Sequence, residues 1–228
     1  MGHDLGHAPF GHAGEHALDE LLSARYGRRF HHNLQSRRVV EVLERDGAGL
    51  NLTREVRDGI EHHTGPGTPA TLEGQIVRVM DRIAYVNHDI EDAERAGVLD
   101  PIELPAAEIG ALGSTTSERL TTLVDDIVAA SAEGERIAQS PEVGEAFIRL
   151  RRFMFRRVYL AAPASEEAER ARGVVQALFT RFHERPELLP PAPETDLVAR
   201  VTDFISGMTD RYALRLYRDA FVPREGPL

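Results

Sequence analysis

The sequence predicts an all-α protein, a helical bundle with additional helices toward its C-terminus. Apolar residues recur at spacings of three and four, and capping residues or Gly and Pro separate these segments. The alternating apolar and polar pattern of a half-buried strand is missing. The chain has 228 residues, of which 42% are hydrophobic and 28% charged, as in globular proteins, and this length suits one domain or one and a half.

Each expected helix follows an apolar stripe that ends at a break. Leu18 and Leu22 lie on one face of the first helix, and Ile76, Ile83 and Ile90 lie on one face of the longest. Gly47, Gly97 and Pro101 are stop signals, and four prolines mark residues 185–194 as a connector. The expected helices span residues 14–26, 34–45, 54–63, 71–96, 114–132, 141–160, 165–184 and 195–220.

Composition excludes several classes of protein. Cysteine is absent, so the chain forms no disulfide and no thiolate metal site. No apolar run approaches the roughly 18 residues of a membrane span and no signal peptide opens the chain, so we expect a cytoplasmic protein that does not enter membranes. A net charge of −10 argues against broad nucleic-acid binding, and all 27 basic residues are arginine.

The chemistry of the chain is concentrated near its start. Residues 3–15 read HDLGHAPFGHAGE, and His183 is the only histidine after His88. Imidazole next to carboxylate suits a divalent first-row metal or Mg²⁺, and histidine transfers protons near neutral pH. A solvated histidine-rich terminus or an affinity scar is the alternative, but a tag would repeat His without Asp, Pro, Phe and Gly at defined steps. His16 is interpreted as a neighbour of the cluster rather than as a ligand.

A second polar group lies on the expected helix 71–96. Asp81, Tyr85 and Asp89 follow one another at four-residue spacing and therefore share one helix face. Such a face can simply be solvated. Because an adjacent His-Asp pair cannot complete a metal shell alone, an aspartate from this helix is also a candidate ligand.

These segments resemble the dGTP triphosphohydrolases of the HD superfamily. The resemblance rests on HDLGHAPFGHAGE at residues 3–15, FHHNLQS at 30–36, LTREVRDGI at 52–60, EGQIVRVMDRIAYVNHDIEDA at 73–93 and VTDFISGMTDRYA at 201–213. It implies an HD-domain helical bundle, with a catalytic core over residues 1–100 and a C-terminal helical region over 101–228. It also implies hydrolysis of a deoxynucleoside triphosphate (dNTP) to deoxynucleoside and triphosphate, with Mg²⁺, Mn²⁺ or a similar divalent metal.

The resemblance assigns a role to each motif residue. A homo-oligomer with a dNTP substrate is expected, and a nucleotide effector is compatible with it. Two other functions stay open: hydrolysis of another phosphate ester, and dNTP binding by a regulatory subunit without catalysis. The implied metal ligands are His3, Asp4 and Asp81, the catalytic residues are His12, Glu15 and His7, and the substrate-binding residues are His32, Asn33, Arg82, Tyr85 and Asp89.

One feature departs from the family pattern. The family's first metal-binding histidine lies in a helix some tens of residues before the HD pair, whereas this sequence starts just before His3. We therefore expect that the sequence is a piece of a longer protein, with three protein ligands for the metal. We further expect that this piece binds metal poorly, turns over slowly or not at all, and exposes apolar surface through which it self-associates.

Overall fold

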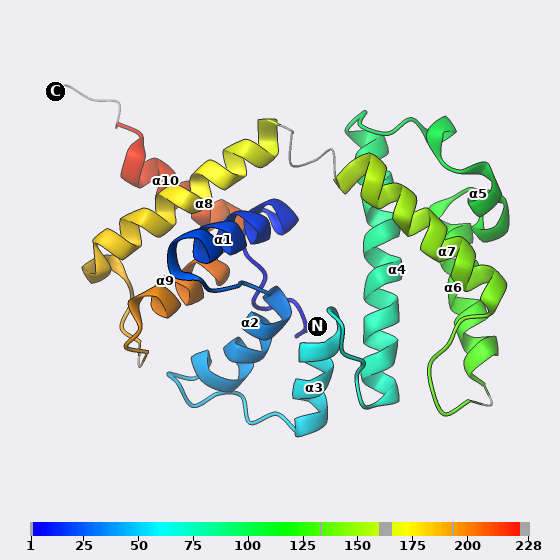
Figure 1. Ribbon diagram of the computed structural model, residues 1–228, viewed down its shortest axis with the longest axis horizontal. Helices are drawn as coiled ribbons and strands as arrows, with labels where there is room; N and C mark the ends of the chain where they lie inside the picture. Colours follow the sequence, from blue (N-terminus) through cyan, green and yellow to red (C-terminus); the bar gives the residue numbers. More distant parts are fainter. Residues whose placement is uncertain (1, 133, 160–165, 193, 224–228) are drawn as a thin grey trace. The chain divides into compact units, whose positions relative to one another are not determined.

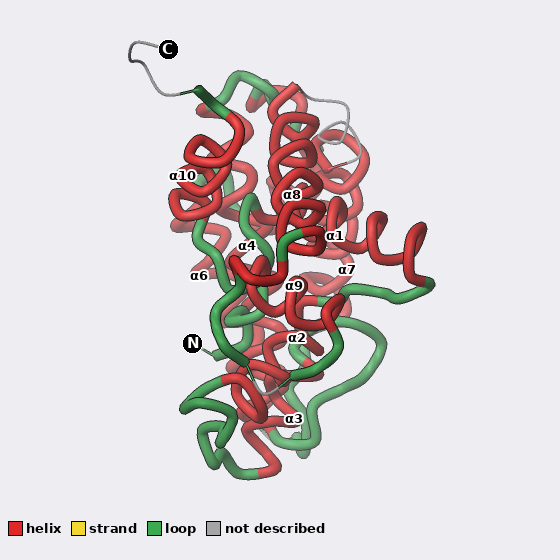
Figure 2. Tube along the Cα trace, turned by 90° about the vertical axis from the view of Figure 1, so that its left-hand side faces the viewer, coloured by secondary structure: helices red, strands yellow, loops and turns green. Residues whose placement is uncertain are grey.

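Every regular element in the described part of the chain is a helix, which confirms the all-α prediction (Figures 1 and 2). The computed structural model describes residues 2–132, 134–159, 166–192 and 194–223. Leu160 and Ser165, at the ends of two expected helices, lie outside these ranges. The chain forms two compact units: the first unit combines residues 1–61 with 164–228, and the second unit holds residues 62–163.

The first unit brings the two ends of the chain into one core. Helix α8 packs against α1, α9 and α10, and Figure 1 shows α1 lying along α8. Leu18 of α1 and Leu178 and Phe179 of α8 are completely buried in this core. Its elements are α1 (Gly11–Tyr26), α2 (His32–Arg38), the π-helical turn η1 (Val39–Leu43), α3 (Arg54–His62, which runs to the unit boundary), α8 (Glu166–Glu184), η5 (Pro186–Leu188), α9 (Leu197–Ser206) and α10 (Asp210–Phe221).

The second unit is built around the longest helix, α4. Its stripe of Ile83, Val86 and Ile90 is buried against residues of α6 and α7, such as Leu123 and Leu150. The elements are α4 (Leu72–Arg95), η2 (Pro101–Glu103), α5 (Ala106–Leu112), α6 (Thr116–Ser131), α7 (Pro141–Met154) and the π-helical turn η3 (Phe155–Tyr159). Thr71 caps α4 by accepting from the Gly74 amide, at the end that the sequence predicted.

A buried polar pair fixes the rotation of α4. Arg119 of α6 is 2% exposed and donates from Nε to Asn87 Oδ1 at 2.8 Å, while Asn87 Nδ2 donates to the Ile83 carbonyl at 2.8 Å. Asn87 faces the core. Tyr85 and Asp89 are each two positions from Asn87, so they point away from it and are only half-buried.

Two predicted boundaries were wrong. The single helix expected over residues 195–220 is divided into α9 and α10, because Thr209 Oγ1 accepts from the Tyr212 amide and so starts a new helix after Gly207. The helix expected over 34–45 ends at Leu43, and Arg45 and Asp46 then take positive φ angles of 53° and 55°. Helix α5 was not predicted at all, because its seven residues are too few for a periodic signal.

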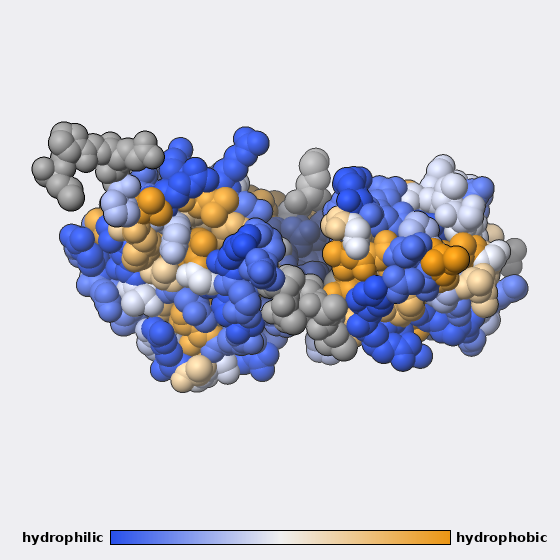
Figure 3. Space-filling model, turned by 90° about the horizontal axis from the view of Figure 1, so that it is seen from above, coloured by the Kyte–Doolittle hydropathy of each residue, from blue (hydrophilic) through white to orange (hydrophobic). Residues whose placement is uncertain are grey.

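The surface of both units carries apolar side chains among charged ones. Figure 3 shows orange areas between blue ones on each unit. In the second unit Val128 and Ile148 are more than half exposed. The predicted self-association of the chain stays a prediction. None of the helices among the described residues is long and apolar enough to cross a membrane.

Candidate active site around Glu15

The segment before α1 is held against α2 by a close backbone approach. The Gly6 amide donates to the buried Ser36 Oγ at 2.9 Å. A Cβ at Gly6 would lie 2.3 Å from the Ser36 nitrogen, so only glycine permits this approach. The His7 amide donates to the Asp4 carbonyl at 3.0 Å and closes a turn. The segment that carries His3 and Asp4 is thereby fixed beside α2.

A tight turn starts α1 and positions its first residues. Phe10 has a φ of 69°, in the left-handed region, and its amide donates to Asp210 Oδ1 of α10 at 2.8 Å. Gly14 lies so close to the turn that a Cβ would be 1.8 Å from the Pro9 carbonyl oxygen. This turn therefore fixes the start of α1, and with it the positions of His12 and Glu15 in the first turns of the helix.

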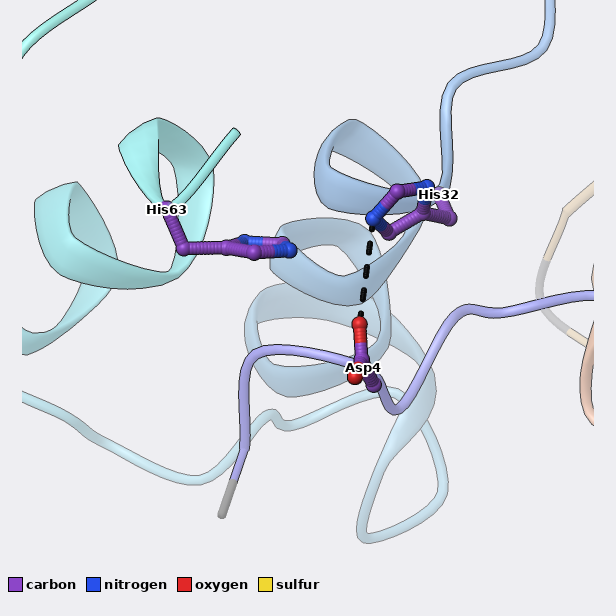
Figure 4. A group of neighbouring side chains, drawn as sticks. All are labelled: Asp4, His32 and His63. Carbon is purple, nitrogen blue, oxygen red and sulfur yellow. Dashed lines mark ion pairs between the residues drawn. The ribbon is translucent and has the colours of Figure 1, made fainter. Parts of the chain in front are cut away.

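The predicted His-Asp pair offers a nitrogen and a carboxylate together. His3 Nε2 lies 2.9 Å from Asp4 Oδ2. The other carboxylate oxygen, Asp4 Oδ1, lies 3.7 Å from His32 Nε2, and Figure 4 shows the two side chains pointing toward one another. Imidazole and carboxylate are suitable donors for a divalent first-row metal.

Glu15 is the centre of a group of histidines. Its Oε1 accepts from the His32 amide at 3.1 Å and from His32 Nδ1 at 2.8 Å. Its Oε2 lies 3.8 Å from His7 Nε2 and 3.7 Å from His12 Nδ1. Burial by itself would raise the pKa of Glu15, but the hydrogen bonds of His12 and His32 and the charge of His32 outweigh it, and the pKa lies well below its ordinary 4.5. Glu15 is therefore a carboxylate at neutral pH.

The hydrogen bond to Glu15 orients the His32 ring. An ionised carboxylate only accepts, so His32 Nδ1 carries the proton that it donates to Glu15. The other ring nitrogen, Nε2, faces Asp4 Oδ1 at 3.7 Å. A histidine that donates one ring nitrogen to a carboxylate and offers the other is the usual arrangement beside a metal.

Asn33 has a structural contact that the sequence did not indicate. Its Nδ2 donates to the Glu61 carbonyl of α3. The amide thus joins α2 to α3, and the substrate-binding role of Asn33 stays a prediction.

The loop before His32 is fixed by Asp19 of α1. Asp19 accepts two hydrogen bonds from the Arg29 guanidinium, at 2.8 Å each, and one from the Phe30 amide at 2.8 Å. Burial raises the pKa of Asp19, but the contacts with Arg29 and Phe30 lower it by more, so the net shift is downward from 3.8.

We expect that Asp19 stabilises the fold at neutral pH and loses this effect in acid. A lowered folded-state pKa contributes stability that is complete above the unfolded value, near 3.8, and disappears as the pH falls through the folded value. Urea unfolding of the wild type and of Asp19→Asn at pH 7 and pH 3 measures it. The difference between the two proteins should shrink at pH 3; a constant difference would contradict the expectation.

The other predicted site residues lie on α4, in the second unit. Tyr85 accepts from Arg151 Nε of α7 through its hydroxyl oxygen. Burial lowers the pKa of Arg82 and the charge of Arg151 lowers it further, while Tyr85 and Asp81 act in the opposite direction. The pKa of Arg78 is also lowered, first by burial and then by the charges of Arg82 and Arg151. Asp81 and Asp89 are half-buried on this helix.

Arg78 and Arg151 were missed by the sequence analysis. Arg78 donates to the carbonyls of His62 and Gly65, at 2.6 and 2.7 Å, which holds its guanidinium beside the start of the unit. Arg151 belongs to an arginine-rich segment in which no spacing distinguishes one arginine from the next. Its contact with Tyr85 and its proximity to Arg82 distinguish it in the structure.

The predicted residues thus form two groups, one in each unit. The first unit brings His3, Asp4, His7, His12, Glu15 and His32 together around two carboxylates. The second unit assembles Arg78, Arg82, Tyr85 and Arg151 beside Asp81. The meeting of Asp81 with His3 and Asp4 stays a prediction.

Two protein families match parts of the chain. Residues 2–86 match the HD domain family, and residues 137–219 match the phosphohydrolase-associated domain. The chain is 46% identical over 228 residues to a deoxyguanosinetriphosphate triphosphohydrolase-like protein of Caldanaerobacter subterraneus, which covers 98% of this chain and 66% of that relative.

Further relatives carry the same description. A deoxyguanosinetriphosphate triphosphohydrolase-like protein of Clostridium perfringens strain SM101 is 42% identical over 238 residues, covering 98% of this chain and 68% of the relative. One of Deinococcus radiodurans is 36% identical over 264 residues, covering 95% and 70%. The chain spans about two thirds of the length of the relatives it matches. It belongs to the deoxyguanosinetriphosphate triphosphohydrolase-like family of HD-domain proteins.

Proposed function

We propose that these residues form the catalytic part of a metal-dependent dNTP triphosphohydrolase, which converts a dNTP to deoxynucleoside and triphosphate. The observation that carries the proposal is Glu15, an anionic carboxylate that is bonded to His32 and faces His7 and His12. Next to it lies the His3–Asp4 pair. Family membership supports HD phosphohydrolase chemistry.

The metal would be held by His3 and Asp4 together with Asp81. The donor set fits a divalent cation, because it combines one imidazole nitrogen with carboxylate oxygens. When bound, the metal supplies Lewis-acid polarisation of a phosphoryl oxygen and neutralises phosphate charge.

His12 is the residue we assign to proton transfer. Its side chain is 65% exposed, so it can reach a bound ligand, and Glu15 lies behind it at 3.7 Å. Formation of deoxynucleoside and triphosphate requires that water adds to the α-phosphorus and that the bond to the 5′-oxygen breaks. The leaving oxygen takes up a proton, which an imidazolium stabilised by Glu15 would donate. His7 and His32 would face the phosphates.

The arginines of the second unit would bind the polyphosphate. Arg151 lies close enough to Arg82 for its charge to lower the pKa of Arg82, and it also donates to the Tyr85 hydroxyl. Clustered guanidinium groups favour an anionic ligand. Tyr85 and Asp89 would face the sugar, where a close Tyr ring can exclude a 2′-hydroxyl.

Replacing Arg151 with glutamine should raise the KM for dNTP by about 10-fold and lower kcat less. One charge-assisted contact to phosphate contributes roughly 1.5–3 kcal/mol, part of which Arg82 can replace. Arg152→Gln, the adjacent exposed arginine, is the matched control. Equal effects of the two substitutions would show that only the net charge of α7 matters.

The direct test is product analysis. The purified protein is incubated with each dNTP and Mn²⁺ or Mg²⁺, and the products are separated by ion-exchange chromatography. Deoxynucleoside and intact triphosphate in equal amounts, lost in Asp4→Ala, support the proposal. Pyrophosphate or orthophosphate as first product would indicate another phosphohydrolase reaction, and binding without turnover would indicate a regulatory subunit.

A further inference from the structure

A second group of metal donors lies beside the His3–Asp4 pair and uses different residues. His7, His12 and Glu15 each offer one donor atom, and these three atoms all lie within 4.8 Å of one another. Glu15 Oε2 is 3.8 Å from His7 Nε2 and 3.7 Å from His12 Nδ1. In tetrahedral Zn²⁺ sites with Zn–N of about 2.0–2.1 Å, neighbouring donors are about 3.3 Å apart. These two contacts of Glu15 are therefore a few tenths of an ångström longer than in such a site, and the third pair lies within 4.8 Å.

The hydrogen bonds of His7 orient its free electron pair toward Glu15. His7 Nδ1 lies 3.0 Å from the Ala8 carbonyl oxygen, which only accepts, so Nδ1 carries the proton in the neutral ring. Nε2 then presents its lone pair to Glu15 Oε2. Two acceptors that face each other are favourable only when a cation lies between them, either a proton or a metal.

The surroundings of the three donors resemble those of a metal site. Glu15 Oε1 accepts a hydrogen bond from His32, so that Oε2 points toward His7 and His12. The His7 ring is held in turn by its hydrogen bond to the Ala8 carbonyl. Such supporting hydrogen bonds orient ligands around bound metals. His12 is largely exposed, which gives an ion a path from solvent and leaves room for a fourth ligand.

We propose that His7, His12 and Glu15 form a second cation site, selective for Zn²⁺ and similar borderline transition metals, whose occupation inhibits the enzyme. Two imidazoles and one carboxylate form the donor set of open zinc sites, whereas Mg²⁺ prefers an all-oxygen shell. An ion here replaces the contact between His12 Nδ1 and Glu15 Oε2 on which the proposed proton transfer depends. The inhibitory effect rests on the proposed function; the binding site does not.

Binding is tested without reference to activity. The double variant His3→Ala/Asp4→Ala removes the neighbouring pair, and its zinc affinity is measured by titration against a chromophoric chelator, with no affinity tag on the protein. We expect one Zn²⁺ per chain. Adding His7→Ala or His12→Ala should weaken zinc binding by more than about 100-fold, since loss of a residue that only supports a metal ligand already lowers metal affinity by roughly 10–100-fold. His16→Ala, an exposed histidine on the same helix, is the control and should change nothing.

Two results would overturn the site: no zinc binding in the double variant, or binding that survives both His7→Ala and His12→Ala. Helix content by circular dichroism verifies that each variant is folded. Of the two substitutions, His12→Ala should disturb folding less, because His12 is exposed. In a separate measurement, Zn²⁺ added to the Mn²⁺-loaded wild type should stop dNTP hydrolysis. Zinc binding without any dNTP hydrolysis would refute the proposed function alone, and hydrolysis that is insensitive to bound zinc would refute the inhibition.

Discussion

Replacing His12 with alanine should lower the kcat for dNTP hydrolysis by about 10²–10⁴, the usual contribution of a positioned acid or base. The reason is the contact of His12 with Glu15, whose pKa is held well below its ordinary value, so that a negative charge stabilises the protonated imidazole as the reaction proceeds. Because His12 is largely exposed, its removal leaves the core intact. KM should change much less than kcat.

The matched control for His12→Ala is His16→Ala. Both histidines lie on α1 and are exposed, and they are one helical turn apart, but among the described contacts only His12 approaches Glu15. Steady-state kinetics at saturating Mn²⁺ compares them. A loss of activity of similar size in both variants, or an unchanged kcat in His12→Ala, would show that this imidazole does not transfer the proton.

The helices were predictable where one face of the segment is apolar over several turns. The stripe of α4 and its Thr71 cap gave both ends of that helix to within one residue. Helix α5 has seven residues, too few for a stripe, and the break between α9 and α10 depends on a Thr209 cap inside an otherwise continuous apolar pattern. A helix boundary that depends on a local capping hydrogen bond, such as the one at Thr209, therefore cannot be predicted from the apolar periodicity alone.

The candidate site was predictable in its residue types but not in its contacts. His7, His12 and Glu15 are close in sequence, so a helix start brings them together. The bond from His32 to Glu15 joins residues 17 positions apart and depends on how the loop between α1 and α2 is fixed by Asp19. Arg151 carries no motif at all, since its role follows from a contact with Tyr85 across 66 positions.

The position of these histidines depends on a small residue, and Gly14→Ala tests this. A Cβ at Gly14 would lie 1.8 Å from the Pro9 carbonyl oxygen, so the Pro9–Phe10 turn has to move away from α1. Clashes with the backbone in a packed region cost typically 1–3 kcal/mol and sometimes more, and we expect about 3 kcal/mol of unfolding free energy here. Hydrolysis should fall as well, because the same turn connects the segment that carries Asp4 to His12.

Gly173→Ala should have the opposite effect on stability. Gly173 lies in α8, in the same unit, is exposed, and would have no atom within 4 Å of an added Cβ. Alanine in an open helix interior stabilises by roughly 0.5–1 kcal/mol relative to glycine. The chain has no tryptophan, so urea unfolding is followed by the helical circular dichroism signal. If Gly14→Ala proved as harmless as Gly173→Ala, the turn before α1 would be free to move, and the close approach at Pro9 could not be what places His12 and Glu15.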